Sequence, residues 1–268
     1  MMNAQRRNHL ALAVRVSVAA CLLAISAHDS AVAQTLPDLV ARAKPSVLLV
    51  GTNAEVDNPR FTFRGTGFVV GDGNRAITNV HVLPEPDALA GAGGLRELVV
   101  QARNGDGSWS IRAAQVIAMD RPHDLALLKF EGPAVPPLEL AAKGRAREGA
   151  EIAIMGFPLG GALGFSTVTH HGILAAITGI ALPPPNARAL NEHAIRQLRD
   201  GSFDIYQLDA TAYPGNSGGP MFDVQTGEVL GIINMVLVKG SKETALSQPS
   251  GISYAIPAYF AAELLRNP

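Results

Sequence analysis

The chain carries the stretch Gly215-Asn216-Ser217-Gly218-Gly219-Pro220, in which one serine stands among glycines. Glycine adopts φ and ψ values that other residues avoid, so this backbone can turn sharply and direct the N–H groups around Ser217 toward one point. A serine hydroxyl attacks well only when a base takes its proton and N–H donors receive the charge that develops on the attacked carbonyl. The stretch therefore predicts a nucleophile, if the chain also supplies a base and a group that orients it.

A histidine and an aspartate earlier in the chain meet this requirement. His81 follows the apolar stretch Ala76-Ile77-Thr78-Asn79-Val80, and Asp124 precedes the apolar run Leu125-Ala126-Leu127-Leu128. A free imidazole titrates near pH ~6.5, so a histidine can both accept and return a proton near neutrality. A carboxylate beside it holds the ring in one tautomer and stabilises its cation. Asp120 is an alternative acid four residues before Asp124.

Six blocks together resemble the HtrA/Deg type of trypsin-like serine protease, and they occur in the order typical of that family. They are Gly65-Thr66-Gly67-Phe68-Val69-Val70, Thr78-Asn79-Val80-His81-Val82, Asp124-Leu125-Ala126-Leu127-Leu128-Lys129, Met155-Gly156-Phe157-Pro158-Leu159-Gly160, Gln207-Leu208-Asp209-Ala210 leading into residues 215–220, and Gly251-Ile252-Ser253-Tyr254-Ala255-Ile256-Pro257. The resemblance implies a catalytic triad of His81, Asp124 and Ser217. It favours Asp124 over Asp120 and implies an oxyanion hole made by the N–H groups of Gly215 and Ser217.

Short apolar runs separated by turn residues predict an all-β fold, either barrels or a sandwich. We expect strands at residues 46–52, 65–70, 75–79, 97–103, 111–119, 125–130, 151–156, 166–176, 205–209, 220–223, 229–238 and 253–256. With the resemblance, this pattern indicates two six-stranded antiparallel barrels of the trypsin-like type, at about 45–135 and 150–257, with the active site between them. Residues 132–149 would form the crossing between the barrels.

Three segments have a helical pattern instead. Residues 35–44 place apolar side chains at helical spacing and end before Pro45, and residues 257–266 begin with proline and form a closing helix. Residues 186–200 would be a helical insert, with surface decoration and a role at the rim of the active site equally open. The sequence after the closing helix leaves no room for the peptide-binding PDZ domain that HtrA-type enzymes commonly carry.

The N-terminal 33 residues have the pattern of a signal peptide. Arg6, Arg7 and Arg15 make a basic start, residues 16–27 are an apolar run, and Ala31-Val32-Ala33 fits a cleavage site. We expect a periplasmic or secreted protease domain at residues 34–268, not stably inserted in a membrane. An uncleaved anchor is the alternative, and Cys21, the only cysteine, offers a faint lipoprotein signal. Removal of this segment would leave no cysteine for a disulfide or a metal.

Composition excludes some classes of function. The net charge of −1 gives no electrostatic case for binding nucleic acid or an anionic membrane. No cofactor or metal is expected, and the expected partners are protein or peptide substrates. Formation of a homo-oligomer stays open, because HtrA-type enzymes often trimerise through N-terminal segments.

The resemblance also places the primary substrate pocket. Its expected residues are Thr211, Ala212, Tyr213, Ile232, Ile233 and Asn234. Thr211 stands where a trypsin-like enzyme selective for basic residues has an aspartate, so we expect preference for small or medium apolar side chains over lysine or arginine. Tyr213-Pro214 departs from the Asn-Arg common in bacterial HtrA enzymes.

Two histidines and one rival function remain from the sequence. His170 and His171 stand where the family usually has a Thr-Gly turn. A solvated loop is expected for them, and an approach of one of them to the cleft is the alternative. The alternative to a protease is a catalytically silent peptide-binding or chaperone-like protein on the same fold, against which the complete set of triad candidates counts.

Overall fold

The structure, a computed structural model, describes residues 34–85, 89, 96–160, 164–179, 203–234 and 251–268. The chain from Gln34 to Pro268 forms one compact unit. The expected signal segment and the expected helical insert at 186–200 lie outside the described residues.

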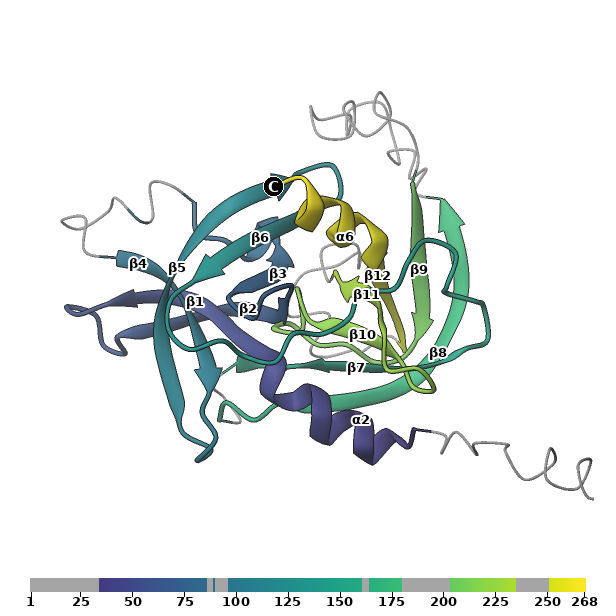
Figure 1. Ribbon diagram of the computed structural model, residues 1–268, viewed down its shortest axis with the longest axis horizontal. Coiled ribbons are helices and arrows are strands. Elements are labelled where there is room, and N and C mark those ends of the chain that lie inside the picture. The colour runs from purple at the N-terminus through teal and green to yellow at the C-terminus, as the bar shows by residue number, and fades with distance from the viewer. Residues whose placement is uncertain (1–33, 86–88, 90–95, 161–163, 180–202, 235–250) are drawn as a thin grey trace, which may run out of the picture. The chain divides into compact units, whose positions relative to one another are not determined.

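The first barrel closes in the strand order β1-β2-β3-β6-β5-β4, with every neighbouring pair antiparallel. Its strands are β1 (Val47–Ala54), β2 (Phe61–Val70), β3 (Arg75–Asn79), β4 (Arg96–Arg103), β5 (Trp109–Asp120) and β6 (Leu125–Phe130). These strands run from purple to teal in Figure 1. A single 3₁₀ turn, η2 (Val80–Val82), follows β3 directly and carries His81.

The second barrel closes in the order β10-β11-β12-β9-β8-β7, again antiparallel throughout. Its strands are β7 (Glu151–Gly156), β8 (Val168–Gly179), β9 (Asp204–Asp209), β10 (Pro220–Asp223), β11 (Val229–Ile233) and β12 (Ile252–Pro257). The two closed barrels confirm the predicted all-β, trypsin-like architecture. Closure leaves no free sheet edge within either barrel.

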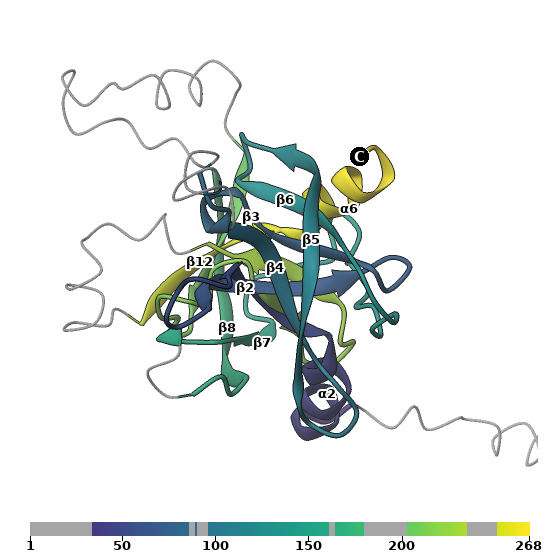
Figure 2. The same cartoon turned by 90° about the vertical axis from the view of Figure 1, so that its left-hand side faces the viewer.

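Both expected terminal helices are present. Helix α2 (Leu36–Ala43) begins at Thr35, whose hydroxyl accepts from the N–H of Asp38, and it buries Leu39 and Ala43. A 3₁₀ turn, η1 (Lys44–Ser46), then leads into β1. Helix α6 (Ala258–Arg266) follows β12 without a break. Figure 2 shows α2 below the strands and α6 at the upper right, beside β5 and β6.

β2 begins four residues earlier than the sequence pattern predicts. Phe61 and Phe63 alternate with Thr62 and Arg64, and both aromatic rings contact Phe165 in an edge-on or tilted arrangement. This alternation is typical of a strand with one packed face. For β11 the described strand ends at Ile233, and the expected continuation beyond residue 234 lies outside the described residues.

The two barrels share part of their core. Each has its own cluster of buried side chains, and a third cluster combines Phe68 and Leu127 of the first barrel with Phe157 and Phe222 of the second. Residues 131–150 connect the barrels and are held by both: the N–H of Leu138 donates to Val69 O at 2.8 Å, and that of Ala141 donates to Val229 O at 2.9 Å. The shared core fixes how the facing loops of the two barrels meet.

Helix α6 also contacts the turn that leads to Asp124. The ring of Phe260 stacks on His123, with centroids 3.7 Å apart and planes at 22°. His123 Nδ1 lies 2.6 Å from Asp120 Oδ2. The helix thereby packs against the β5–β6 turn of the first barrel, one residue before Asp124. Within the described residues, no helix combines the length and the apolar character needed to span a membrane.

Candidate active site

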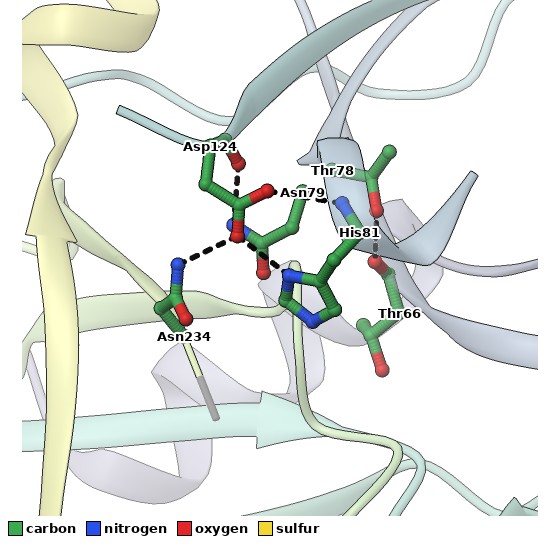
Figure 3. Close-up of polar contacts among 6 residues, drawn as sticks. All are labelled: Thr66, Thr78, Asn79, His81, Asp124 and Asn234. Carbon is green, nitrogen blue, oxygen red and sulfur yellow. Dashed lines mark hydrogen bonds and ion pairs between the residues drawn. The ribbon is translucent and has the colours of Figure 1, made fainter. Parts of the chain in front are cut away.

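Asp124 holds His81 by both its side chain and its main chain. The carboxylate Oδ2 lies 2.5 Å from His81 Nδ1, and Oδ1 accepts from the His81 backbone N–H at 2.9 Å (Figure 3). The Asp124 carbonyl accepts from Asn79 Nδ2 at 3.0 Å and from the Val80 N–H at 3.1 Å. One residue therefore fixes the end of β3, the η2 turn and the orientation of the imidazole, whose Nε2 stays on the side away from the carboxylate.

Asp124 adopts a positive φ of 55° at the tight turn before β6. Aspartate occupies this left-handed region more readily than most residues. The alternative acid Asp120 contacts His123 rather than His81. The structure therefore brings Asp124 and His81 together and places Asp120 against His123.

Asn234 from the second barrel contacts the same carboxylate. Its side-chain Nδ2 donates to Asp124 Oδ2 at 2.8 Å, and its backbone N–H donates to Tyr254 O at 3.0 Å. The sequence pattern places Asn234 in the substrate pocket, whereas its amide points at Asp124 in Figure 3. The signal for this contact is weak in the sequence, because Asn234 comes directly after an apolar strand, and only the meeting of the barrels shows its partner.

The Ser217 loop lies between the barrels. The Ser217 carbonyl accepts from the Thr66 N–H of β2 at 2.9 Å, and the N–H of Gly218 donates to Ile233 O of β11 at 2.9 Å. Gly218 has φ 82°, and a side chain there would collide with Thr66 O. Only glycine allows the loop to lie this close to the first barrel. Thr66 also accepts at its carbonyl from the Thr78 hydroxyl at 2.7 Å, three residues before His81.

The backbone N–H groups of the loop fall into two sets. Those of Asn216, Gly218 and Gly219 donate to carbonyls of the protein. In contrast, those of Gly215 and Ser217 donate to no atom of the described residues. Buried N–H groups usually have a partner, so two neighbouring donors without one are available to a ligand. Within the same residues the Ser217 hydroxyl makes no hydrogen bond, although the residue is only 6% exposed.

Thr66 is a residue of this site that the sequence interpretation missed. Its hydroxyl donates to Gly215 O at 2.7 Å and accepts from the Phe157 N–H at 3.2 Å. A fully buried threonine therefore joins the first barrel to the Ser217 loop and to the end of β7. The pattern Gly65-Thr66-Gly67 offers a signal, since a hydroxyl between two glycines can approach neighbouring backbone closely.

The remaining pocket residues of the sequence interpretation occupy two environments. Thr211, Ala212 and Tyr213 are half-buried before the Ser217 loop. Ile232 and Ile233 are fully buried on β11, where they belong to different core clusters. Their side chains thus face opposite sides of the strand, and it is the backbone of Ile233 that contacts the loop.

The prediction that His170 lies on a solvated loop is wrong, because the residue lies half-buried on strand β8. It pairs there with Ile154 of β7, and its ring centroid is 5.8 Å from that of Tyr213. Its Nε2 is buried without a partner among the described residues, and burial lowers the pKa of the imidazole. The shift favours the neutral ring. His171, its neighbour, is exposed.

No group of three or more histidine, cysteine or acidic side chains in the described part of the chain could hold a metal ion. The region holds an imidazole paired with a carboxylate, His81 and Asp124, and a serine loop in which two N–H donors have no partner among the described residues.

Comparison with known proteins identifies the class. Residues 65–232 match the trypsin-like peptidase domain family, and the chain belongs to this family. The match includes His81, Asp124 and Ser217 and most of both barrels.

Individual proteins that the chain resembles are of the HtrA/Deg type. A "probable periplasmic serine endoprotease DegP-like" of Halomonas elongata is 28% identical over 97% of this chain and 55% of its own length. Serine protease HTRA3 of Homo sapiens is 30% identical over 83% of this chain and 42% of its own length. A solved structure of the HtrA-type protease AlgW with a tripeptide has a TM-score of 0.57 at 28% identity, covering 85% of this chain and 61% of that one. The chain spans about half the length of the two curated relatives.

The Thr66 hydroxyl predicts a difference in stability between two substitutions. Thr66→Val leaves the Gly215 carbonyl and the Phe157 N–H without their buried partner, so we expect the free energy of unfolding to fall by about 1–3 kcal/mol. Thr66→Ser keeps the hydroxyl and should lose less. Denaturant unfolding of both variants and the wild type checks this, and equal stability of the two variants would contradict the assignment.

His170 predicts a dependence of stability on pH. Its pKa is lowered in the folded state, so the unfolded chain takes up a proton first as the pH falls through about 6.5, and stability is then lost. We expect the free energy of unfolding of His170→Gln to fall less steeply than that of the wild type between pH 7 and 5. His171→Gln, which replaces the exposed neighbour, serves as the control. An unchanged slope in His170→Gln would refute the prediction.

Proposed function

We propose that this chain is an exported serine endopeptidase that cleaves peptide bonds in unfolded or exposed segments of proteins. In this proposal Ser217 is the nucleophile, His81 is the general base and then the general acid, and Asp124 orients and stabilises the imidazole. The backbone N–H groups of Gly215 and Ser217 form the oxyanion hole. The observation that carries the proposal is the 2.5 Å contact between His81 Nδ1 and Asp124 Oδ2, together with the two N–H donors of the Ser217 loop that have no partner among the described residues.

The chemistry would proceed in two half-reactions. His81 Nε2 takes the proton of the Ser217 hydroxyl as its oxygen bonds to the substrate carbonyl carbon, and the oxyanion receives hydrogen bonds from the two N–H groups. The imidazolium then protonates the leaving amine, and the C–N bond breaks to leave an acyl-enzyme. A water molecule, activated by the same imidazole, hydrolyses the ester and restores Ser217. Asp124 remains a carboxylate and stabilises the imidazolium in both halves.

In this proposal, the hydrogen bond between His81 and Ser217 forms when substrate binds. No hydrogen bond joins the two side chains in the described residues, but catalytic hydrogen bonds are often long before substrate is bound. The β2 strand supports their approach, because Thr66 bonds both the Ser217 carbonyl and the Thr78 hydroxyl.

Several observations support the substrate class and the compartment. The HtrA-type relative AlgW has been solved with a tripeptide, and the DegP-like relatives are described as periplasmic. The basic, apolar and Ala31-Val32-Ala33 segments favour export of this chain as well. A peptide bound as an added strand would gain main-chain hydrogen bonds irrespective of its sequence.

The primary pocket is proposed to prefer small or medium apolar side chains. None of Thr211, Ala212 and Tyr213 carries a charge, so a lysine or arginine placed there would lose water without gaining a carboxylate. Tyr213 lies against the ring of His170, and an imidazole supplies no negative charge for a basic side chain either.

A single set of experiments tests nucleophile and specificity together. The purified wild type is expected to react with a fluorophosphonate probe and to cleave unfolded casein, mostly after small or medium apolar residues. Ser217→Ala should lose both activities, because residues 215–220 contain no other hydroxyl. Ser166→Ala, at an exposed serine of the second barrel, is the matched control and should retain both. Probe labelling that survives in Ser217→Ala would sink the nucleophile assignment.

Absence of labelling and cleavage in the folded wild type from pH 6 to 9 would instead favour the silent peptide-binding protein. Cleavage mainly after lysine or arginine would overturn the proposed pocket while leaving the triad intact.

A further inference from the structure

Residues 157–160 form a turn with an unexpected residue at its third position. The N–H of Gly160 donates to Phe157 O at 3.4 Å, Pro158 occupies the second position, and Leu159 has φ 59° at the third. Proline followed by a residue of positive φ is the pattern of a type II turn, in which glycine or asparagine normally takes the third position. Leu159 and Asp124 are the two non-glycine residues with positive φ among the described residues.

A leucine in the left-handed region needs a compensating contact, because its side chain crowds the backbone there. The N–H of Leu159 provides one: it donates to Pro214 O at 2.8 Å. Pro214 lies directly before Gly215 in the Ser217 loop. The turn also lies against Gly215, since a side chain there would collide with Phe157 O and would come within 3.4 Å of Leu159 N.

The geometry of the Pro214–Gly215 peptide links this contact to the direction of the Gly215 N–H. The Pro214–Gly215 bond is trans, as the cis peptide of the described residues is Asn58–Pro59. In a planar trans peptide the C=O and N–H point in opposite directions. Because Leu159 holds the Pro214 carbonyl, the N–H of Gly215 must point away from Leu159. That N–H is one of the two donors that have no partner in the described residues.

We propose that Leu159 is a positioning residue for the oxyanion hole, acting through its left-handed backbone rather than through its side chain. Its N–H anchors the Pro214 carbonyl, and this orients the N–H of Gly215 toward the substrate. Without the anchor, the peptide can rotate and present its carbonyl where the substrate oxyanion must bind. The inference rests on the proposed function, and it adds a residue that does not touch the substrate.

A matched pair of substitutions separates backbone from side chain. Valine is close to leucine in polarity but is β-branched and disfavours positive φ, whereas asparagine is polar but readily adopts it. For cleavage of an apolar peptide substrate, we expect Leu159→Val to lower kcat by about 10- to 100-fold with KM changed less than about threefold, since one oxyanion donor accounts for about 10²–10³ in rate. Leu159→Asn should rescue kcat to within about threefold of the wild type.

A transition-state analogue gives a second readout. A peptidyl trifluoromethyl ketone forms a tetrahedral adduct whose oxygen needs the same donors, so its affinity should fall in Leu159→Val by the factor seen in kcat/KM and stay near wild type in Leu159→Asn. Thermal unfolding confirms that each variant is folded. If Leu159→Val does not fold, Leu159→Ile, which is also β-branched and has the same number of side-chain carbons as leucine, takes its place with the same expectation.

The outcomes separate this inference from the proposed function. An active wild type with Leu159→Val equally active, or with Leu159→Asn impaired as much as Leu159→Val, overturns the backbone role of Leu159. Loss in Leu159→Asn alone would show that the apolar side chain matters instead, which also overturns it. An inactive wild type, with no adduct to the trifluoromethyl ketone, refutes the protease itself.

Discussion

The carboxylate of Asp124 accepts hydrogen bonds from both barrels. It accepts from the backbone and the ring of His81 in the first barrel and from the amide of Asn234 in the second. Hydrogen bonds to an ionised acceptor are shorter and stronger than neutral ones. The carboxylate is partly exposed, with 26% of its side-chain surface accessible. The strength of these hydrogen bonds therefore depends on their geometry more than on burial. The positive φ of Asp124 and the bonds from Asn79 and Val80 to its carbonyl fix that geometry.

The remaining structure supports this contact by bringing backbones unusually close. The shared core that includes Phe68 and Phe157 sets the distance between barrels. Across that interface Gly218 fits only because it lacks a side chain, and the Thr66 hydroxyl satisfies a carbonyl of the Ser217 loop and an N–H of β7. The Leu159 turn then sets one peptide of the same loop. Packing, glycine and a few buried hydrogen bonds thus act on one short segment, 213–219.

The strands could be predicted well from the sequence, because short apolar runs between turn residues are a local signal, whereas their closure into two barrels was expected only from the family resemblance. The runs at β3, β6, β7 and β10 were predicted to the residue, since turn residues bound each of them. The early start of β2 depends on Phe61 and Phe63 packing on Phe165, a contact between distant segments that local pattern does not reveal.

The site was predictable to a lesser extent. The motifs around His81, Asp124 and Ser217 are enough to propose these residues from the sequence. In contrast, the contacts of Thr66, Asn234 and Leu159 involve partners far along the chain. His170 was placed on a solvated loop, but pairing of β8 with β7 carries it to Tyr213. Residue type suggests chemistry, and only the meeting of the barrels decides which carboxylate, amide or N–H a group contacts.

The central claim is that Asp124, and not the neighbouring Asp120, orients the histidine. The most direct measurement compares kcat/KM of Asp124→Asn and Asp120→Asn with that of the wild type on one peptide substrate, after thermal unfolding shows that both variants fold. The account predicts a loss of about 10²–10⁴-fold for Asp124→Asn, because an amide cannot stabilise the imidazolium and favours the wrong tautomer. It predicts a loss below about tenfold for Asp120→Asn, whose carboxylate contacts His123 instead. Asp124→Asn with near wild-type kcat/KM, or an equal loss in both variants, would contradict it.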